Sequence, residues 1–301
     1  MNKVPIVFHP NYDVTVVGGS RFPVQKYQYL KKLLEKEGIL TISNLFVPSS
    51  LTMTDIYITH HQPYVDRVKN LSLLEKEKRQ IGLPSIDLFC ERAFFSAGGT
   101  YLAAKLALKF GFAANGAGGS HHAARFGGSG FCIFNDVAIA VNCLLKYRAV
   151  RNVIILDLDV HQGDGTAEIF KSDDRVFTVS IHCKKNFPLK KACSDLDLGM
   201  DAGVTDRDYL STLERVLDQI SQVPADLIVY NAGVDVHEND SLGHLKLSSF
   251  GIELRENKVV DFAVNRRVPL LVTLGGGYQK NVANLALLHS MIFKAVAIRL
   301  K

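Results

Sequence analysis

Asp157, Asp159 and His161 follow one another at intervals of two residues, at the end of an apolar run, 153–156. Such a run is typical of a buried strand, and in extended chain side chains two residues apart point to the same side. The two carboxylates and the imidazole would therefore lie within reach of one cation. Burying two carboxylates so close together is costly unless a metal ion or a proton compensates their charge. The alternative is that the aspartates only cap the next helix, and this spacing by itself favours neither.

A second apolar run, 227–230, is followed by Asn231, Gly233 and Asp235. Asp235 would complete a set of two aspartates and one histidine with Asp159 and His161, which favours the metal site over the caps. Three protein ligands and an open position are typical of a catalytic rather than a structural zinc. Because the set is rich in oxygen, it would also accept Fe²⁺, Co²⁺ or Mn²⁺.

His121 and His122 come directly after a pair of glycines. Two adjacent imidazoles can supply a general base and a charged partner, because both titrate near neutral pH. Glycines beside them let a substrate approach the backbone closely. The alternative for such a pair is ordinary surface sequence, and this is the interpretation we give to the other pair, His60 and His61.

Tyr278 follows three consecutive glycines, 275–277, directly after an apolar run, 270–273. A mobile turn of this kind can place a phenol over a substrate oxygen, where it would stabilise developing negative charge. Taken alone, the motif favours the simpler interpretation of a tight turn that ends in a packed aromatic ring. Neither glycine-rich segment fits the GxGxxG or GxxxxGK[ST] fingerprint of nucleotide binding.

The elements that must position these residues alternate between strands and helices. Strands are predicted at 6–8, 153–156, 176–181, 227–230 and 270–273, and helices at 23–36, 61–70, 97–110, 135–147, 206–221, 248–264 and 280–299. Nearly continuous Val/Ile/Leu strands joined by helices predict an α/β fold, with a mainly parallel sheet and helices on both faces. Two long segments without periodicity, 111–134 and 182–204, are expected to be functional loops. We expect one domain, 1–301, with its ligands at the carboxyl ends of the strands.

The composition excludes several classes of protein. The net charge of +5 arises from 35 basic and 30 acidic residues, with no long basic run, so direct nucleic-acid binding is not expected. No apolar run approaches 18 residues and the first ten residues lack the length of a signal peptide, so we expect no membrane insertion and a cytoplasmic protein. An odd number of cysteines without a CxxC pair agrees with a reducing compartment. They are Cys90, Cys132, Cys143, Cys183 and Cys193.

Five motifs in order, GGSHHA, GGSGFCIFND, DLDVHQGDGT, NAGVD and GGGY, resemble the zinc-dependent histone deacetylase family. They span about 118–278, and the flanking helices are compatible with the family over nearly the whole chain. The chain looks closest to the class IV branch in its compact length, in DLDVHQGDG and in the segments RRVP and GGYQK near its end. The resemblance implies an arginase-deacetylase fold.

The resemblance also implies a ligand set and a reaction. Zn²⁺ would be held by Asp159, His161 and Asp235 and would activate a water that attacks an amide carbonyl. Tyr278 would polarise that carbonyl together with the metal.

The two histidines receive distinct roles from the same resemblance. His122 would act as general base and then as general acid, with His121 beside it as electrostatic partner. Asp157 would hold His121, and Asp164 would hold His122.

The family further implies two binding regions. A structural K⁺ would be bound by main-chain oxygens near Asp157, Asp159, His161, Ser180 and Ile181. A tunnel for the acylated lysine would be lined by Gly130, Phe131, Phe187 and Leu242. Ser120 departs from the family, which usually has a bulky aromatic residue there, and we expect this small residue to enlarge the pocket beneath the metal.

The leading hypothesis is metal-dependent hydrolysis of an acyl-lysine amide in a protein or peptide, with either acetyl or long-chain fatty acyl groups. A second is deacetylation of a small amine such as an acetylpolyamine, which would need a narrow acidic entrance. A two-metal ureohydrolase is weaker, because DxDxxD is missing and only His237 and Asp240 follow nearby. A non-catalytic scaffold that binds acyl ligands is the remaining alternative.

Overall fold

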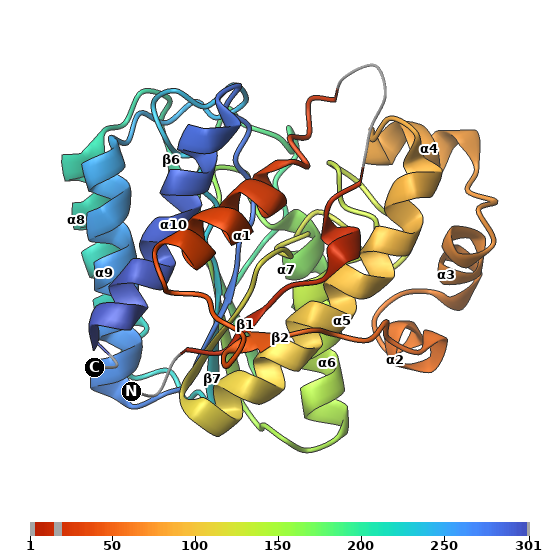
Figure 1. The fold of residues 1–301 in the computed structure, drawn as a ribbon, viewed down its shortest axis with the longest axis horizontal. Helices are drawn as coiled ribbons and strands as arrows, with labels where there is room; N and C mark the ends of the chain where they lie inside the picture. Colours follow the sequence, from red (N-terminus) through yellow and green to blue (C-terminus); the bar gives the residue numbers. More distant parts are fainter. Residues whose placement is uncertain (1–3, 15–19, 300–301) are drawn as a thin grey trace.

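The computed structural model describes residues 4–14 and 20–299, which form an eight-stranded sheet between two layers of helices (Figure 1). All pairs of neighbouring strands are parallel, in the order β2-β1-β3-β8-β7-β4-β5-β6. The strands are β1 Ile6–Val7, β2 Leu45–Phe46, β3 Phe112–Asn115, β4 Val153–Asp157, β5 Val176–Cys183, β6 Leu196–Met200, β7 Leu227–Asn231 and β8 Leu270–Thr273. The prediction of an α/β fold with a parallel sheet is confirmed.

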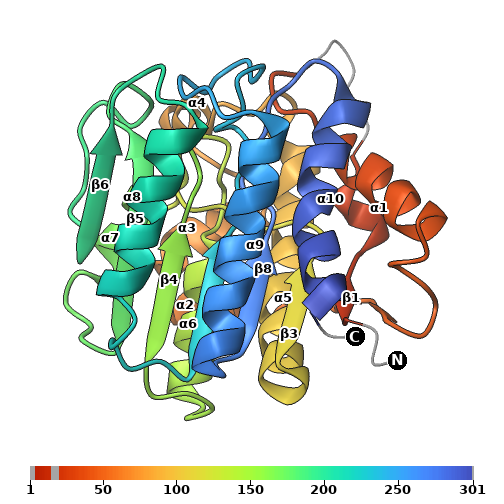
Figure 2. The same ribbon diagram turned by 90° about the vertical axis from the view of Figure 1, so that its left-hand side faces the viewer.

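Helices cover both faces of this sheet. Figure 2 shows α8, α9, α10 and α1 side by side across one face, whereas α5, α6 and α7 pack on the other. The helices are α1 Lys26–Lys36, α2 Met53–Tyr57, α3 Gln62–Lys69, α4 Glu75–Ile81, α5 Ile86–Phe110, α6 Asp136–Lys146, α7 Asp164–Phe170, α8 Asp206–Gln219, α9 Ser249–Arg266 and α10 Val282–Arg299.

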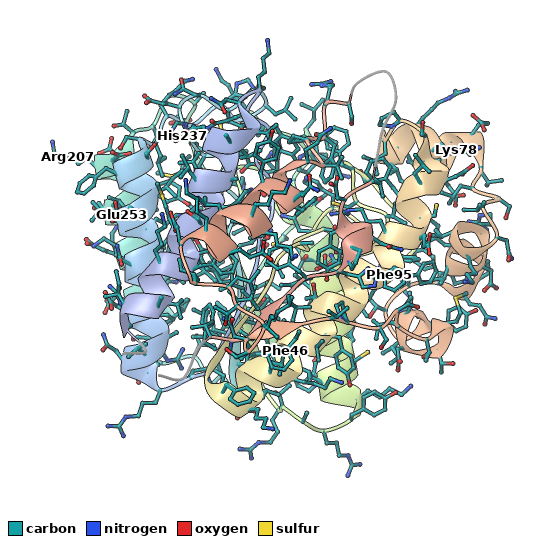
Figure 3. The ribbon with its side chains drawn as sticks, in the orientation of Figure 1. Phe46, Lys78, Phe95, Arg207, His237 and Glu253 are labelled. Carbon is teal, nitrogen blue, oxygen red and sulfur yellow. The ribbon has the colours of Figure 1, made fainter. Side chains whose placement is uncertain are left out.

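The central strands contribute side chains to two separate cores. In β4, Ile154 and Leu156 belong to the core beneath α8, α9 and α10, whereas Val153 and Ile155 belong to the core beneath α5 and α6. All four are apolar because a central parallel strand has no face exposed to water. Side chains fill the space between the layers, as Figure 3 shows. The central strands are therefore continuous runs of buried apolar residues, as the sequence predicts.

Two strands lie inside segments that were predicted to be irregular. β3 lies within 111–134 and has the sequence FAAN, whose small alanines are buried by their central position in the sheet. β6 lies within 182–204 at the sheet edge, and of its five residues only Met200 is buried. Main-chain pairing with β5 therefore holds β6, and neither strand has the large apolar run that marks a strand in the sequence. The predictions of irregular structure at these two strands were wrong.

Helix α10 is long and apolar enough to cross a membrane, by length and composition alone. Helices that pack in the interior of a protein meet the same criterion. About 50% of α10 is buried inside the protein, where it contacts α1 and α9. The expectation that the chain has no transmembrane helix stays a prediction.

The chain segment at Ser49 packs closely against helix α5 at Gly98. A Cβ at position 98 would overlap the carbonyl oxygen of Ser49. Alanine in place of a glycine in a helix ordinarily stabilises a protein by up to about 1 kcal/mol. We predict the opposite sign for Gly98→Ala, a loss of about 1–3 kcal/mol in the free energy of unfolding. Urea denaturation measures it.

The matched control is Gly127→Ala, since a Cβ at Gly127 would meet nothing within 4 Å. Its effect should be close to zero. A stabilised Gly98→Ala variant would contradict the packing described for α5.

Candidate active site

The residues predicted to bind the metal and to carry out the reaction lie together at one edge of the sheet. Strands β3, β8, β7 and β4 are consecutive neighbours and all parallel, so their carboxyl ends share this edge. It is the upper edge in Figure 2, to which the arrowheads of β4, β5 and β6 point. Asp157 ends β4 and Asn231 ends β7, with Asp159 and Asp235 a few residues beyond.

Asp159, His161 and Asp235 form one cluster. All three are buried, and one potential ligand atom from each lies within 4.8 Å of the others. The Nδ1 of His161 is 3.0 Å from Asp159 Oδ1 and 3.1 Å from Asp235 Oδ2. These three side chains, predicted as ligands, are therefore aimed at a common point.

Backbone amides fix the remaining carboxylate oxygens. Gly276 N–H donates to Asp159 Oδ2 at 2.6 Å, and Val160 N–H donates to Asp235 Oδ1 at 2.9 Å. Each aspartate therefore turns its other oxygen towards His161. Because this orientation is set by the main chain, the cluster does not depend on flexible side chains for its shape.

The electrostatics of the cluster favour a cation. Burial and the charge of Asp159 raise the pKa of Asp235 to about 7. Burial alone would lower the pKa of His161, but its bonds to Asp159 and Asp235 raise it to about 10. Asp235 and His161 thus hold protons that a divalent metal would replace, whereas the pKa of Asp159, which burial alone would raise, is kept well below its usual range by the nearby imidazoles. The donor set fits catalytic Zn²⁺.

His121 and His122 lie beside this cluster with their ring centroids 4.1 Å apart. The Nδ1 of His121 is 2.7 Å from Asp157 Oδ2, and the Nδ1 of His122 is 2.6 Å from Asp164 Oδ1. The pairing of histidines with aspartates is the one that the sequence analysis expects. A carboxylate at Nδ1 favours a proton there, which leaves Nε2 of a neutral His122 as a proton acceptor.

The two imidazoles differ in charge. Burial opposes a charge on His121, but Asp157 and Asp159 raise its pKa to about 9. Burial and the positive charge of His121 lower the pKa of His122 to about 4. His121 is therefore cationic at neutral pH and His122 is neutral, as an electrostatic partner and a general base require.

Tyr278 faces the cluster from the turn after β8. Its ring centroid lies 6.1 Å from that of His161. Its N–H donates to Asp240 Oδ2 at 2.7 Å, and the buried Lys26 donates from Nζ to the carbonyl of Gly275 at 3.0 Å. Burial and the nearby carboxylates raise the pKa of the phenol, so it stays a hydrogen-bond donor.

A pocket of about 440 Å³ leads from the surface to these groups. Phe187 stands at its wall with its ring centroid 4.9 Å from that of His122. The four residues predicted to line an acyl-lysine tunnel all line this pocket, together with several that the sequence did not suggest. The lining consists of Arg21, His122, Gly130, Phe131, His161, Lys185, Asn186, Phe187, Ser241, Leu242, His244 and Tyr278.

Comparison with known proteins places this geometry in a family, because residues 20–294 match the model of the histone deacetylase domain. The chain belongs to the histone deacetylase family. Histone deacetylase 2 of Arabidopsis thaliana is 30% identical, over 94% of this chain and 76% of that protein. An uncharacterized protein of Picosynechococcus is 41% identical over 97% of both chains.

The structural comparison agrees on the fold. The crystal structure of the HDA15 HD domain superposes with a TM-score of 0.78, over 97% of this chain and 88% of that domain, at 20% identity. The sheet and its helices therefore have the arginase-deacetylase fold. Histone deacetylase relatives indicate a hydrolase, whereas membership of class IV stays a prediction.

The expectation that Ser120 enlarges the pocket beneath the metal stays a prediction. Ser120 borders a cavity of about 30 Å³ that Asp159 and Tyr278 also line, and a second cavity of about 10 Å³. Phe89 and Arg92 of α5 line the smaller cavity together with Phe131. The larger of these cavities has about the volume of one water molecule in the liquid.

His60 is also placed differently from its prediction as surface sequence. It is fully buried, whereas His61 is exposed. The N–H of Asn135 donates to His60 Nε2 at 2.9 Å, and His60 Nδ1 lies 3.0 Å from the carbonyl oxygen of Ala124. His60 therefore connects the two ends of the loop that follows His121 and His122.

The two residues that could have bound a second metal ion, His237 and Asp240, are engaged in other hydrogen bonds. Asp240 accepts backbone N–H groups from Leu242 and Gly243 as well as Tyr278. His237, which Figure 3 labels, lies 3.1 Å from Ser249 Oγ and 2.9 Å from the amide nitrogen of Gln279. Among the residues that the structure describes, the cluster of Asp159, His161 and Asp235 is the one group suited to a metal.

Two buried polar residues, Asn231 and Arg255, support the site although the sequence assigned them no role. Asn231 donates from Nδ2 to Asp157 Oδ1 at 3.1 Å. Arg255 of α9 donates from Nη1 to the carbonyls of Leu158 at 3.2 Å and Gly233 at 2.7 Å. It thereby joins the two chain segments that carry the aspartate ligands. Its only signal in the sequence is a charge on the apolar face of a helix.

The residues predicted around a monovalent cation also lie together. Asp157 pairs with Ser180 in the register of β4 and β5, and Ile181 follows Ser180 along β5. Asp159 and His161 continue the chain after β4. A K⁺ at this position is a proposal that this arrangement permits.

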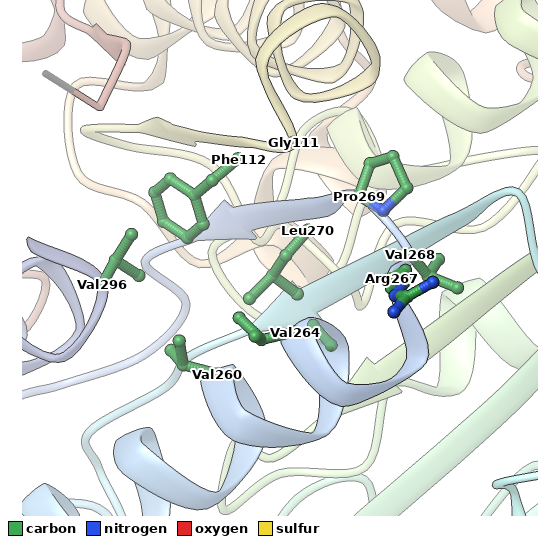
Figure 4. Close-up of a pocket in the computed structure, with 10 residues that line it drawn as sticks. Gly111, Phe112, Val260, Val264, Arg267, Val268, Pro269, Leu270 and Val296 are labelled. Carbon is green, nitrogen blue, oxygen red and sulfur yellow. The ribbon is translucent and has the colours of Figure 1, made fainter. Parts of the chain in front are cut away.

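A second cavity lies at the opposite end of the sheet, where β8 begins (Figure 4). It has a volume of about 240 Å³, and Val260 and Val264 of α9, Val296 of α10 and Phe112 line it. Arg267 is its only charged lining residue. Its lining has no metal ligand or nucleophile, whereas His122, His161 and Tyr278 line the 440 Å³ pocket.

The metal site predicts a thermal shift. Zn²⁺ at about 100 times its Kd should add about 2.7 kcal/mol to the stability of the metal-free protein. Asp235→Asn should abolish this gain because it removes a ligand charge, whereas Asp164→Asn should keep it. Thermal unfolding of each variant with and without Zn²⁺ measures the gain, and an undiminished shift in Asp235→Asn would contradict the ligand assignment.

Proposed function

We propose that this protein hydrolyses the amide of Nε-acetyl-lysine and releases acetate and free lysine. The observation that carries the proposal is the neutral His122, which lies between the predicted metal ligand His161 and the aromatic wall residue Phe187 of the 440 Å³ pocket. When bound, Zn²⁺ would supply Lewis acidity to the attacking water and to the amide carbonyl. Family membership supports the same class of reaction.

The chain's own residues would divide the proton transfers. His122 would take a proton from the attacking water at Nε2, since its Nδ1 is bonded to Asp164. It would then deliver that proton to the departing lysine nitrogen. His121 would remain charged against Asp157 and oppose the negative charge that develops on the amide oxygen.

Tyr278 would bind the amide oxygen of the substrate through its phenol group. The three glycines before it form a turn held by Lys26 at the carbonyl of Gly275 and by Asp240 at the tyrosine N–H. The phenol donates to the oxyanion while Phe131 and Phe187 enclose the lysine methylenes. Enclosure of each methylene contributes about 0.8 kcal/mol.

Substitution of Tyr278 by phenylalanine removes this donor and keeps the ring. We predict that Tyr278→Phe lowers kcat by about 100- to 1000-fold, since the lost bond forms in the transition state. KM should change little. The measurement is acetate release by the zinc-loaded enzyme, with Tyr29→Phe as an exposed control that keeps full activity. A Tyr278→Phe variant with normal kcat would exclude the role.

The small cavity beside Ser120 leads us to propose acetyl rather than long-chain acyl groups. Its volume of about 30 Å³ suits the end of a short acyl group and has no room for a chain of fourteen carbons. We predict that acetyl-lysine peptides exceed myristoyl-lysine peptides in kcat/KM by about tenfold or more. A series from acetyl to myristoyl on one peptide tests this, and a maximum at the longest chain would identify a fatty deacylase instead.

The presence of every group that the reaction needs argues against a non-catalytic scaffold. The cluster of metal ligands, both histidines and the tyrosine are all present around one pocket. We propose Zn²⁺ as the resident metal, with Fe²⁺ or Co²⁺ as substitutes that the oxygen-rich set would accept.

A further inference from the structure

We infer that the mouth of the pocket selects acylated lysines whose neighbouring groups are carboxylates. This inference rests on the proposed function and adds the charge of the substrate to it. Three basic side chains, Arg21, Lys185 and His244, line the outer part of the 440 Å³ pocket, and all three are exposed. No aspartate or glutamate is among the residues that line it.

The two permanent cations at the mouth lack compensating charges. Neither Arg21 nor Lys185 makes an ion pair or a side-chain hydrogen bond within the described ranges 4–14 and 20–299. Residues 15–19, which precede Arg21, are Thr-Val-Val-Gly-Gly and contain no acid. The carboxylates that contact the lining residues are already engaged: Asp164 pairs with His122, Asp159 and Asp235 face His161, and Asp240 accepts backbone N–H groups.

The loop around Phe187 adds to this charge. Its sequence, KKNFPLKK at 184–191, has four lysines around the aromatic wall. Lys184 pairs with Asp201 at 3.1 Å, and Lys191 donates to the carbonyls of Asn186 and Pro188. Lys185 and Lys190 project into solvent. The surplus positive charge is therefore at the entrance.

The position of these cations determines what they would contact. Arg21 adjoins Phe22, whose ring centroid lies 6.0 Å from that of Phe131 and 6.5 Å from that of Tyr278. With the amide at Tyr278 and the methylenes beside Phe131, the backbone of the substrate lysine reaches the mouth. A carboxylate next to this lysine would face Arg21 and Lys185, whereas a second cation would be repelled.

Two sources can supply such a carboxylate: a flanking Asp or Glu in a peptide, or the α-carboxylate of free Nε-acetyl-lysine. The same charges disfavour acetylpolyamines, because an acidic entrance is what those cations require. Charges near a surface act mainly through attraction before binding, and salt screens them.

The test uses the zinc-loaded, full-length protein and three peptides with blocked ends, in which Asp, Ala or Lys flanks one acetyl-lysine. We expect kcat/KM to fall from the Asp to the Lys peptide by roughly tenfold at low salt, and this ratio to shrink in 0.5 M NaCl. Free Nε-acetyl-lysine and acetylspermidine form two further arms. Rapid turnover of the free amino acid would identify the α-carboxylate as the source.

Charge reversal at the mouth should invert the preference. In the double variant Arg21→Glu/Lys185→Glu the Lys peptide should become the better substrate. Lys109→Glu is the matched control, since this exposed lysine ends α5 at the opposite edge of the sheet and should leave the ratio unchanged.

The outcomes separate the two levels of the proposal. Absence of turnover with every substrate would overturn the proposed function itself. Equal turnover of the Asp and Lys peptides, or a ratio that the double variant leaves unchanged, would overturn only the inference about charge. If the double variant instead loses binding to phosphatidylserine vesicles with peptide selectivity unchanged, the lysines face a lipid surface and the inference is wrong.

Discussion

Two buried carboxylates that face the same imidazole set the main constraint on this structure. Asp159 and Asp235 turn one oxygen each towards His161. Burial raises the pKa of Asp235, and the negative charge of Asp159 beside it raises this pKa further. Like charges in a buried site are stable only with a proton or a cation between them. The proposed chemistry of the pocket follows from this requirement, since the cation that would satisfy it is also the group that we propose activates water.

The fold supplies the means to hold the carboxylates in place. Neighbouring parallel strands deliver both aspartates to one edge, and backbone amides of Val160 and Gly276 fix their outer oxygens. Arg255 joins the carbonyls just before each ligand, which places a permanent cation behind the site. The same edge carries the histidine loop after β3 and the tyrosine turn after β8. The main chain therefore fixes both aspartates, whereas the side chains of Asp157 and Asp164 orient the two histidines.

Sequence reasoning succeeded where periodicity and strand ends carry the information. The spacing of Asp157, Asp159 and His161 reflects the two-residue repeat of an extended chain, and Asp235 follows its strand in the same way. These residues converge because all strand ends share one edge. Their roles in catalysis stay predictions, although the contacts of both histidines are those that the resemblance implies.

It failed where the answer depends on distant packing. The residues that flank His60 in the sequence do not distinguish it from a surface histidine. The tertiary structure buries its side chain between Ala124 and Asn135. Phe89 and Arg92 of α5 line a small cavity together with Ser120, a proximity that the local sequence does not indicate. The sequence assigned no role to Asn231, which lies inside the NAGVD motif, or to Arg255, which lies outside every motif. A buried polar residue is recognised by its partners, and those lie far away in sequence.

The central claim is that one metal ion, held by these carboxylates, enables hydrolysis of an acetyl-lysine amide. The most direct measurement is acetate release from an acetyl-lysine peptide while Zn²⁺ is titrated into chelator-stripped protein. The account predicts that the rate rises in proportion to bound zinc and levels off at one equivalent per chain. A full rate without metal, or no acetate with one equivalent bound, would contradict it.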